Sequence, residues 1–124
     1  MSAIAYGRDR LASIAARRPA NAPAPPPRQV TLEFLVNIHV ALPPGMASHE
    51  RQEVYAAEAV QAASLAAAGR LVRLWRIPGR TANWGLWRAA DATELHDALT
   101  SLPLWPYMHI EVVPLAKHPN DPAS

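Results

Sequence analysis

Residues 32–42 read LEFLVNIHVAL, and along this stretch apolar and polar side chains alternate. Apolar side chains would share one face of an extended chain: Leu32, Phe34, Val36, Ile38 and Val40. The opposite face would carry Glu33, Asn37 and His39. A period of two is typical of a strand with one buried face. The stretch therefore predicts a half-buried strand that needs partner strands and a covering layer.

The chain after this strand alternates between helical and extended patterns. PPG at residues 43–45 breaks the first strand, Ser48 is predicted to cap a helix that reaches Ala68, and Gly69 suits the helix end. RLVRLWRI (70–77) and TANWGLWRA (81–89) predict a second and a third strand around a PGR turn.

The last third of the body predicts one more helix and one more strand. Asp91 and Glu94 resemble a capping box for the helix ATELHDALTSL (92–102). In the connector that follows, Pro103 and Pro106 are expected to hold Leu102 and Trp105 extended. YMHIEVVPL (107–115) predicts the fourth strand, and its proline at position 114 suits an edge strand or a residue beyond pairing.

The predicted order is βαββαβ, which indicates an α+β, ferredoxin-like fold. Right-handed crossovers would place both helices on one face of a four-stranded antiparallel sheet. The other face would carry Leu35 with Trp75 or Trp84 beside polar groups. This mixture predicts that a partner subunit or a ligand covers that face.

Composition and charge predict that the 124 residues form one domain with a segment on either side of it. Half the residues are apolar and none is cysteine, so a single core is expected without disulfides. Residues 1–30 are predicted to be a disordered Arg/Pro-rich extension, 31–119 the domain, and 120–124 a tail. The extension is Arg-rich like a targeting peptide, but its paired arginines lead into prolines and not into an apolar segment.

The charge distribution narrows the expected partners. Residues 1–28 hold five arginines against one aspartate, a net charge of +4, and the rest of the chain carries −2. The body thus has no basic stripe, which argues against nucleic-acid binding. No apolar run approaches the ~20 residues that a membrane span needs.

Glu58 is the carboxylate that the pattern singles out. Val54, Glu58, Gln61 and Leu65 recur at helical spacing in an otherwise alanine-rich segment, so Glu58 would lie at the edge of the core. Partial burial would raise its pKa and make it a usable proton acceptor. The alternative is a glutamate at the margin of a solvated face.

Other polar residues have both functional and structural interpretations. Arg73 and Arg76 would lie on opposite strand faces, so one could bind a carboxylate ligand or remain an ordinary surface arginine. Asn83 could bind a ligand or its own backbone, and His96 reads as a packed, hydrogen-bonded histidine. Candidate metal ligands on strands one and four are His39, His109 and Glu111. They lack short ligand spacing, so no metal site is predicted.

Long motifs in the body resemble the muconolactone Δ-isomerase family over residues 32–119. They are LPPGM, LWRIPGRTANWGLW and ELHDALTSLPLWPYMHIEVVPLAKHP, in that order. The resemblance implies a cytoplasmic, cofactor-free isomerase of the catechol branch of the β-ketoadipate pathway, assembled as a homo-oligomer, usually a decamer. Its substrate would be a small lactone, muconolactone, converted to 3-oxoadipate enol-lactone.

The same resemblance implies roles for individual residues. Glu58 would be the base, and Arg76 would bind the substrate carboxylate. Candidate donors to the lactone are Asn83, His96 and Tyr107. Candidate pocket walls are Trp75 and Trp105.

Three positions depart from the family pattern: Ala59 where lysine is common, Thr81 where tyrosine is usual, and His109 where aspartate follows PYM. Three alternatives to the usual activity therefore stay open. They are a paralogue for a substituted lactone, a non-catalytic oligomer that binds small acids, and a ferredoxin-like monooxygenase.

Overall fold

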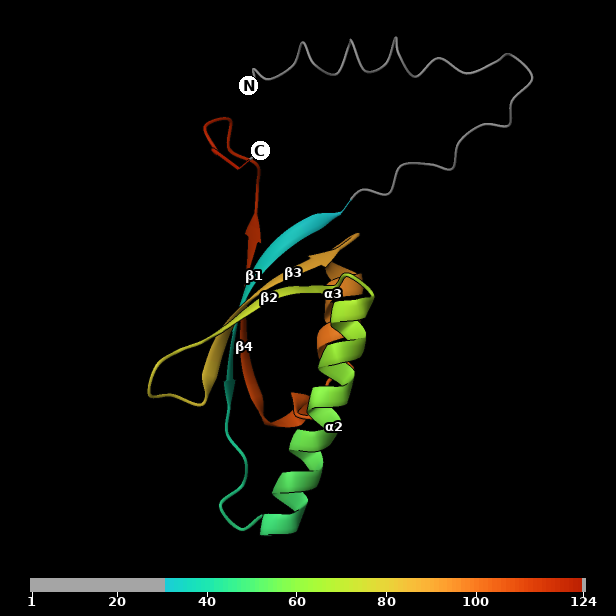
Figure 1. The fold of residues 1–124 in the computed structure, drawn as a ribbon, viewed down its shortest axis with the longest axis vertical. Coiled ribbons are helices and arrows are strands. Elements are labelled where there is room, and N and C mark those ends of the chain that lie inside the picture. Colours follow the sequence, from blue (N-terminus) through green and yellow to red (C-terminus); the bar gives the residue numbers. More distant parts are fainter. Residues whose placement is uncertain (1–30, 124) are drawn as a thin grey trace, which may run out of the picture. The chain divides into compact units, whose positions relative to one another are not determined.

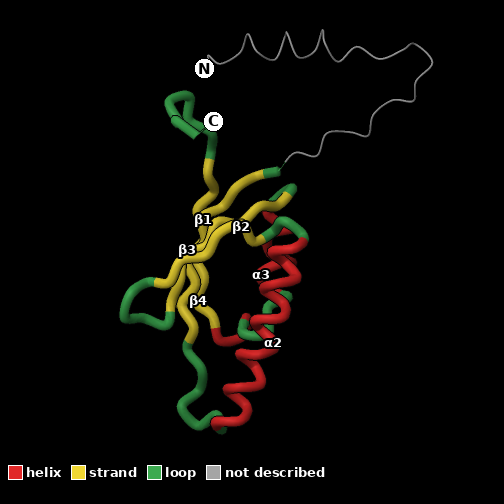
Figure 2. The backbone as a smooth tube through the Cα atoms, in the orientation of Figure 1, coloured by secondary structure: helices red, strands yellow, loops and turns green. Residues whose placement is uncertain are grey.

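The computed structural model describes residues 31–123, and of these residues 31–115 belong to one compact unit. The predicted extension 1–30 lies outside the described residues. The elements follow the order β1 (Leu32–Val40), α2 (Ser48–Ala67), β2 (Leu71–Arg76), β3 (Ala82–Ala89), α3 (Ala92–Thr100) and β4 (Met108–Leu115). The sheet order is β2-β3-β1-β4 with antiparallel neighbours, and both helices lie on one side of the sheet (Figures 1 and 2). The predicted ferredoxin-like α+β fold is confirmed.

The alternation along β1 builds the core as expected. Phe34, Val36 and Ile38 are buried beneath the helices, while the residues between them are partly or fully exposed. Across β1 and β3, Phe34 pairs with Trp87, which is 2 % exposed. The core is completed mainly by Leu95, Ala98 and Leu99 of α3 and by Leu102, two residues after the helix ends.

Helix α2 begins differently from the prediction and ends as predicted. Its N-cap is Ala47 and Ser48 is already helical, so the prediction of Ser48 as the cap is wrong. No side chain caps the first turn, and Glu50 Oε1 instead accepts the backbone N–H of Ala47 at 3.3 Å. At the other end Gly69 takes φ +79°, a conformation that glycine adopts without strain.

Helix α3 is capped as predicted. Asp91 Oδ1 accepts the backbone N–H of Glu94 at 2.8 Å, and Glu94 Oε1 accepts the backbone N–H of Ala90 at 2.7 Å. The Glu94 carboxylate also meets Arg70 at 3.2 Å. These contacts fix the start of α3 against the end of α2.

The connector between α3 and β4 is not fully extended. Residues Trp105–Tyr107 form a 3₁₀ turn, so the expectation that Pro106 holds Trp105 extended is wrong. Pro106 lies within the first two positions of this turn, where its missing N–H costs no hydrogen bond. β4 accordingly begins at Met108, and Pro114 lies on an edge strand as predicted.

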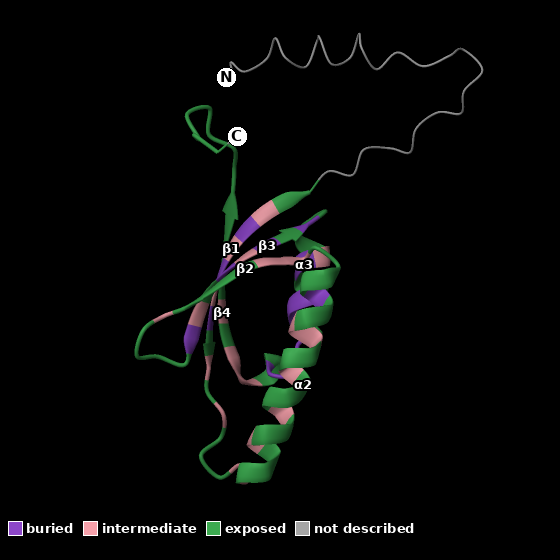
Figure 3. Cartoon of the chain, viewed as in Figure 1, coloured by how far each residue is buried: buried purple, intermediate pink, exposed green. Residues whose placement is uncertain are grey.

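Helix α2 packs loosely on the sheet. Only Leu65 of its twenty residues is buried, whereas burial concentrates on β1, β3 and α3 (Figure 3). Small alanine side chains on α2 leave space above the sheet that the longer side chains of α3 fill elsewhere. The fold thus leaves room for a cavity beneath α2.

The opposite face of the sheet is open in the described residues. The strand pairings place Leu35 on this face as predicted, and both Trp75 and Trp84 lie there where one of the two was expected. Val113 joins them. The guanidinium of Arg73 lies 4.8 Å from the centroid of the Trp75 ring. Four large apolar side chains with exposed surface therefore share a face with charged groups.

The segment from Ala116 belongs to a separate unit. Within it Asn120 donates its backbone N–H to His118 Nδ1 at 3.0 Å, and Ala123 donates to Asp121 Oδ1 at 2.9 Å. Among residues 31–123 no helix is long and apolar enough to cross a membrane.

Candidate functional site

A cavity of about 510 Å³ lies between α2 and the helix-facing side of the sheet. Most of its wall is apolar, with contributions from β1, β2, β3, α2 and the start of β4. Its polar side chains are Tyr55, Glu58, Arg76, Thr81, Asn83 and Trp87. A mostly apolar cavity of this size with a few polar groups is the usual form of a small-molecule site.

Glu58 lies on the α2 stripe that periodicity predicted. Its Oε1 accepts the backbone N–H of Leu104 at 3.0 Å, and the side chain is half-buried. Loss of hydration raises the pKa of Glu58 above 4.5, and the Leu104 hydrogen bond opposes part of this rise. The carboxylate is therefore a stronger proton acceptor than a solvated one, and it is held in place.

Arg76 and Asn83 pair directly across β2 and β3 and both line the cavity. Arg73 lies on the opposite face, which confirms the predicted division of the two arginines. Within residues 31–123 Arg76 forms no ion pair. The cavity thus combines one held carboxylate with one cation that is open to an anionic ligand.

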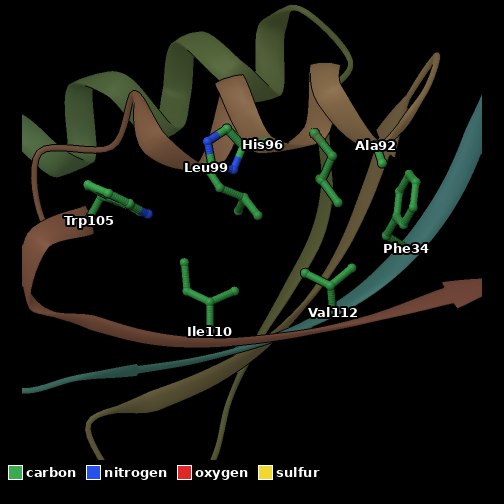
Figure 4. A pocket seen from close by; sticks show the side chains of 8 residues that line it. Phe34, Ala92, His96, Leu99, Trp105, Ile110 and Val112 are labelled. Carbon is green, nitrogen blue, oxygen red and sulfur yellow. The ribbon is translucent and has the colours of Figure 1, made fainter.

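The structure does not bring all the predicted site residues together. His96 and Trp105 line a second cavity of about 340 Å³, between α3 and β4 (Figure 4). In that view Ile110 and Val112 point from β4 toward α3, and Phe34 closes the far end. Trp75 is on the open sheet face, and Tyr107 lines neither cavity. Glu58, Arg76 and Asn83 are the predicted residues that share one cavity.

His96 also differs from its predicted environment. Its side chain is exposed and makes no hydrogen bond among the described residues, so the prediction of a packed, hydrogen-bonded histidine is wrong. It stays exposed at this second cavity because Leu95, Ala98 and Leu99 occupy the buried positions of the short helix α3.

Tyr55 and Trp87 are cavity residues that the sequence reasoning missed. Tyr55 lies three residues before Glu58, a spacing that places both on one helix face. Trp87 lies four residues after Asn83 in a strand, so the two share a face. Periodicity alone could have located them, had it been applied from Glu58 and Asn83 outward.

The histidines of the open face are neighbours, as predicted. His39 pairs with His109 across β1 and β4, and Glu111 follows on the same face. No group of three or more potential metal ligands forms within residues 31–123.

Comparisons with known proteins agree on one family. A family profile described as Muconolactone delta-isomerase matches residues 32–121. The Muconolactone Delta-isomerase of Rhodococcus opacus is 39 % identical over 88 residues, which cover 71 % of this chain and 95 % of the relative. That of Pseudomonas aeruginosa is 40 % identical over 87 residues, covering 70 % of this chain and 91 % of the relative.

A solved structure shows that the similarity extends to the fold. A crystal structure of muconolactone isomerase superposes with a TM-score of 0.70 at 38 % identity. The match covers 74 % of this chain and 96 % of that chain. Sequence and structural similarity therefore extend over nearly the whole length of these relatives.

Proposed function

The chain belongs to the muconolactone delta-isomerase family, and from this premise we propose that it isomerises muconolactone in the cavity beneath α2, with Glu58 as the proton shuttle. The chain is an isomerase by its family. Family membership favours this activity over a non-catalytic acid-binding oligomer and over a monooxygenase. The residue roles below are our proposal.

Moving the ring double bond requires removal of one proton and return of another. The base takes the ring proton at the carbon that bears the acetate arm. The electron pair of that C–H bond enters the conjugated system, and negative charge develops on the lactone carbonyl oxygen. The same carboxyl group then returns the proton to the carbon next to the carbonyl. A single carboxylate suits both steps if it is held between the two carbons.

Glu58 has the properties that this shuttle needs. Partial burial raises its pKa, so the carboxylate accepts a proton more readily than a solvated glutamate does, and the protonated group can then return that proton to the dienolate. The Leu104 N–H holds one carboxylate oxygen at 3.0 Å, and within residues 31–123 the other oxygen has no protein partner. This half-buried, backbone-held carboxylate in a mostly apolar cavity is the observation that carries the proposal.

Arg76 and Asn83 complete the proposed site. The Arg76 guanidinium would bind the acetate group, because a planar cation pairs bidentately with a carboxylate. Asn83 would donate to a lactone oxygen from the neighbouring strand. No step of this reaction exchanges electrons with a cofactor, so none is invoked.

The decisive experiment is turnover of muconolactone by the purified full chain, followed by ultraviolet absorbance. Glu58→Gln should lower kcat by roughly 10²–10⁴-fold, the usual contribution of a positioned acid–base group. Glu53→Gln is the matched control, because Glu53 is exposed on the same helix. Wild-type turnover in Glu58→Gln would reject the assigned base.

A substituted lactone is a second candidate substrate, favoured by one observation. Ala59 and Thr81, two of the positions that depart from the family pattern, both line the cavity. His109, the third, lies on the open sheet face and not at the cavity. Small residues at 59 and 81 widen the wall, which would admit a ring substituent. Comparing kcat/KM for muconolactone and a methyl-substituted muconolactone distinguishes the two substrates.

We also propose that the enzyme is a cytoplasmic homo-oligomer, a decamer by resemblance to its family. The exposed Trp75, Trp84 and Val113 on the open sheet face support burial of that face against another copy. Light scattering on the purified chain measures the assembly, and a monomer would refute it.

A further inference from the structure

The inner face of β3 carries a short row of residues beneath α2. Asn83, Gly85 and Trp87 follow one another at the two-residue spacing that places strand side chains on one face. They pair across the sheet with Ile38, Val36 and Phe34, the buried residues of β1. Asn83 and Trp87 both line the cavity that contains Glu58.

Two buried polar atoms in this row lack a partner among the described residues. They are the Asn83 Oδ1 and the Trp87 Nε1. Trp87 is 2 % exposed, so water does not reach its indole N–H from the surface. A buried donor without a partner is destabilising, because it has lost its hydrogen bonds to water and gained none in return. Such a group at the wall of a ligand cavity is a sign that the ligand supplies the missing acceptor.

Gly85 leaves room for the indole N–H of Trp87, because glycine has no Cβ atom. A Cβ atom at residue 85 would lie 2.6 Å from Trp87 Nε1 and 3.3 Å from Leu74 Cδ1. The N–H therefore occupies space that any other residue at 85 would fill. Leu74 lines the cavity and is 51 % exposed, and its Cδ1 lies beside the same point.

We propose that Trp87 donates its indole N–H to the lactone oxygen on which negative charge develops, with Asn83 as the second polar group on that side. This inference rests on the proposed function. The ligand displaces the Leu74 methyl group to reach the donor. His96 and Tyr107, which the sequence offered as donors, do not line this cavity, and Trp87 takes the role they leave open.

The proton balance of the reaction is unchanged by this donor. Glu58 removes and returns the transferred proton, while the indole keeps its own proton and supplies a hydrogen bond. Its effect is to stabilise the dienolate more than the neutral lactone, because the bond strengthens as charge builds on the oxygen. The loss of such a donor therefore acts on kcat more than on KM.

The kinetic test uses Trp87→Phe in the full chain, with Trp84→Phe as the control. Trp84 has the same side chain on the same strand but lies on the open face. We expect kcat for muconolactone to fall by about 10²-fold in Trp87→Phe, in line with loss of one oxyanion donor, and to stay at the wild-type level in Trp84→Phe. Replacing Trp87 with benzothienylalanine removes only the N–H and keeps the shape, which separates a lost donor from a repacked core.

A spectroscopic test does not depend on turnover. Glu58→Gln is expected to bind muconolactone and to convert it roughly 10²–10⁴-fold more slowly, so ¹⁵N-labelled indole signals of this variant are recorded with and without the ligand before it turns over. The Trp87 signal, assigned by its absence in Trp87→Phe, should move downfield as the N–H gains an acceptor, and the Trp84 signal should stay in place.

The outcomes separate this inference from the proposed function. Turnover by the wild type with an unmoved Trp87 signal, or wild-type kcat in the benzothienylalanine protein, would overturn the indole donor alone. Absence of both muconolactone binding and turnover in the wild type would overturn the proposed function and this inference together.

Discussion

Shortening Glu58 by one methylene tests whether the connector after α3 positions the base. In Glu58→Asp the carboxylate withdraws by about 1.5 Å, the length of one carbon–carbon bond. The Oε1–N distance to Leu104 is 3.0 Å in the wild type, so the bond is lost. The carboxylate is still present and can still ionise, but nothing holds it at its former place.

Two separate losses are expected from this change. The Leu104 N–H belongs to a residue that is 3 % exposed, and an unpartnered buried N–H costs about 1–3 kcal/mol of unfolding free energy. We expect the lower part of that range because Glu58 itself is only half-buried. A misplacement of about 1 Å can cost about 10²-fold in rate, so kcat should fall by a similar factor.

The assay pairs muconolactone turnover with urea unfolding of the same preparations. Glu53→Asp makes the same chemical change at an exposed position of α2 and should leave both quantities unaltered. A Glu58→Asp enzyme with kcat within threefold of the wild type and an unchanged unfolding midpoint would refute the positioning role of Leu104.

Four further expected outcomes rest on the same geometry. Arg76→Ala should raise KM for muconolactone by about 10-fold or more at similar kcat, because a charge-assisted pair with the substrate is lost. Arg76→Lys should restore part of the affinity, and an unchanged KM in Arg76→Ala would exclude Arg76 as the anion site. Burial raises the pKa of Glu58, so kcat/KM should rise with pH to a midpoint above 4.5, and a midpoint below 4.5 would contradict the assigned base. Protonation of Glu58 stabilises the folded state fully below pH 4.5, and this contribution is lost as the pH rises through the folded-state pKa. Over that window the unfolding free energy of the wild type should fall relative to that of Glu58→Gln. Gly85→Ala should destabilise the fold by about 1–3 kcal/mol in urea unfolding, because its Cβ would meet Trp87 Nε1 at 2.6 Å, and a neutral effect would show that the indole moves aside freely.

The connector that precedes β4 has a different role from the one that the family resemblance implied. Trp105 was expected as a pocket wall and Tyr107 as a donor, yet Trp105 faces the cavity beside α3 and Tyr107 lines neither cavity. Its contribution to the Glu58 cavity comes from backbone and apolar groups. The Leu104 N–H holds the carboxylate, and Leu102 and Leu104 form part of the wall.

Much of the fold could be predicted from local patterns. The alternation in β1, the turn residues and the Asp91 cap each act over a few residues, so periodicity and capping rules identify them. The predictions for Ser48 and Trp105 failed at element ends. At the start of α2 the Glu50 side chain, and not that of Ser48, accepts a backbone hydrogen bond. In the connector Trp105 and Pro106 form a 3₁₀ turn in place of the extended backbone that proline favours before it.

In the candidate site, too, some features follow from single elements and others depend on how the elements pack. The sequence by itself determined that Glu58 lies on the less exposed stripe of α2 and that Arg73 and Arg76 lie on opposite strand faces, because both follow from the geometry of single elements. Only the tertiary structure decided that Asn83 and Trp87 share the Glu58 cavity while His96 and Trp105 line another. That partition depends on how far the alanine-rich α2 stands off the sheet and where α3 fills the gap. Packing between elements sets these distances, and no single element encodes them.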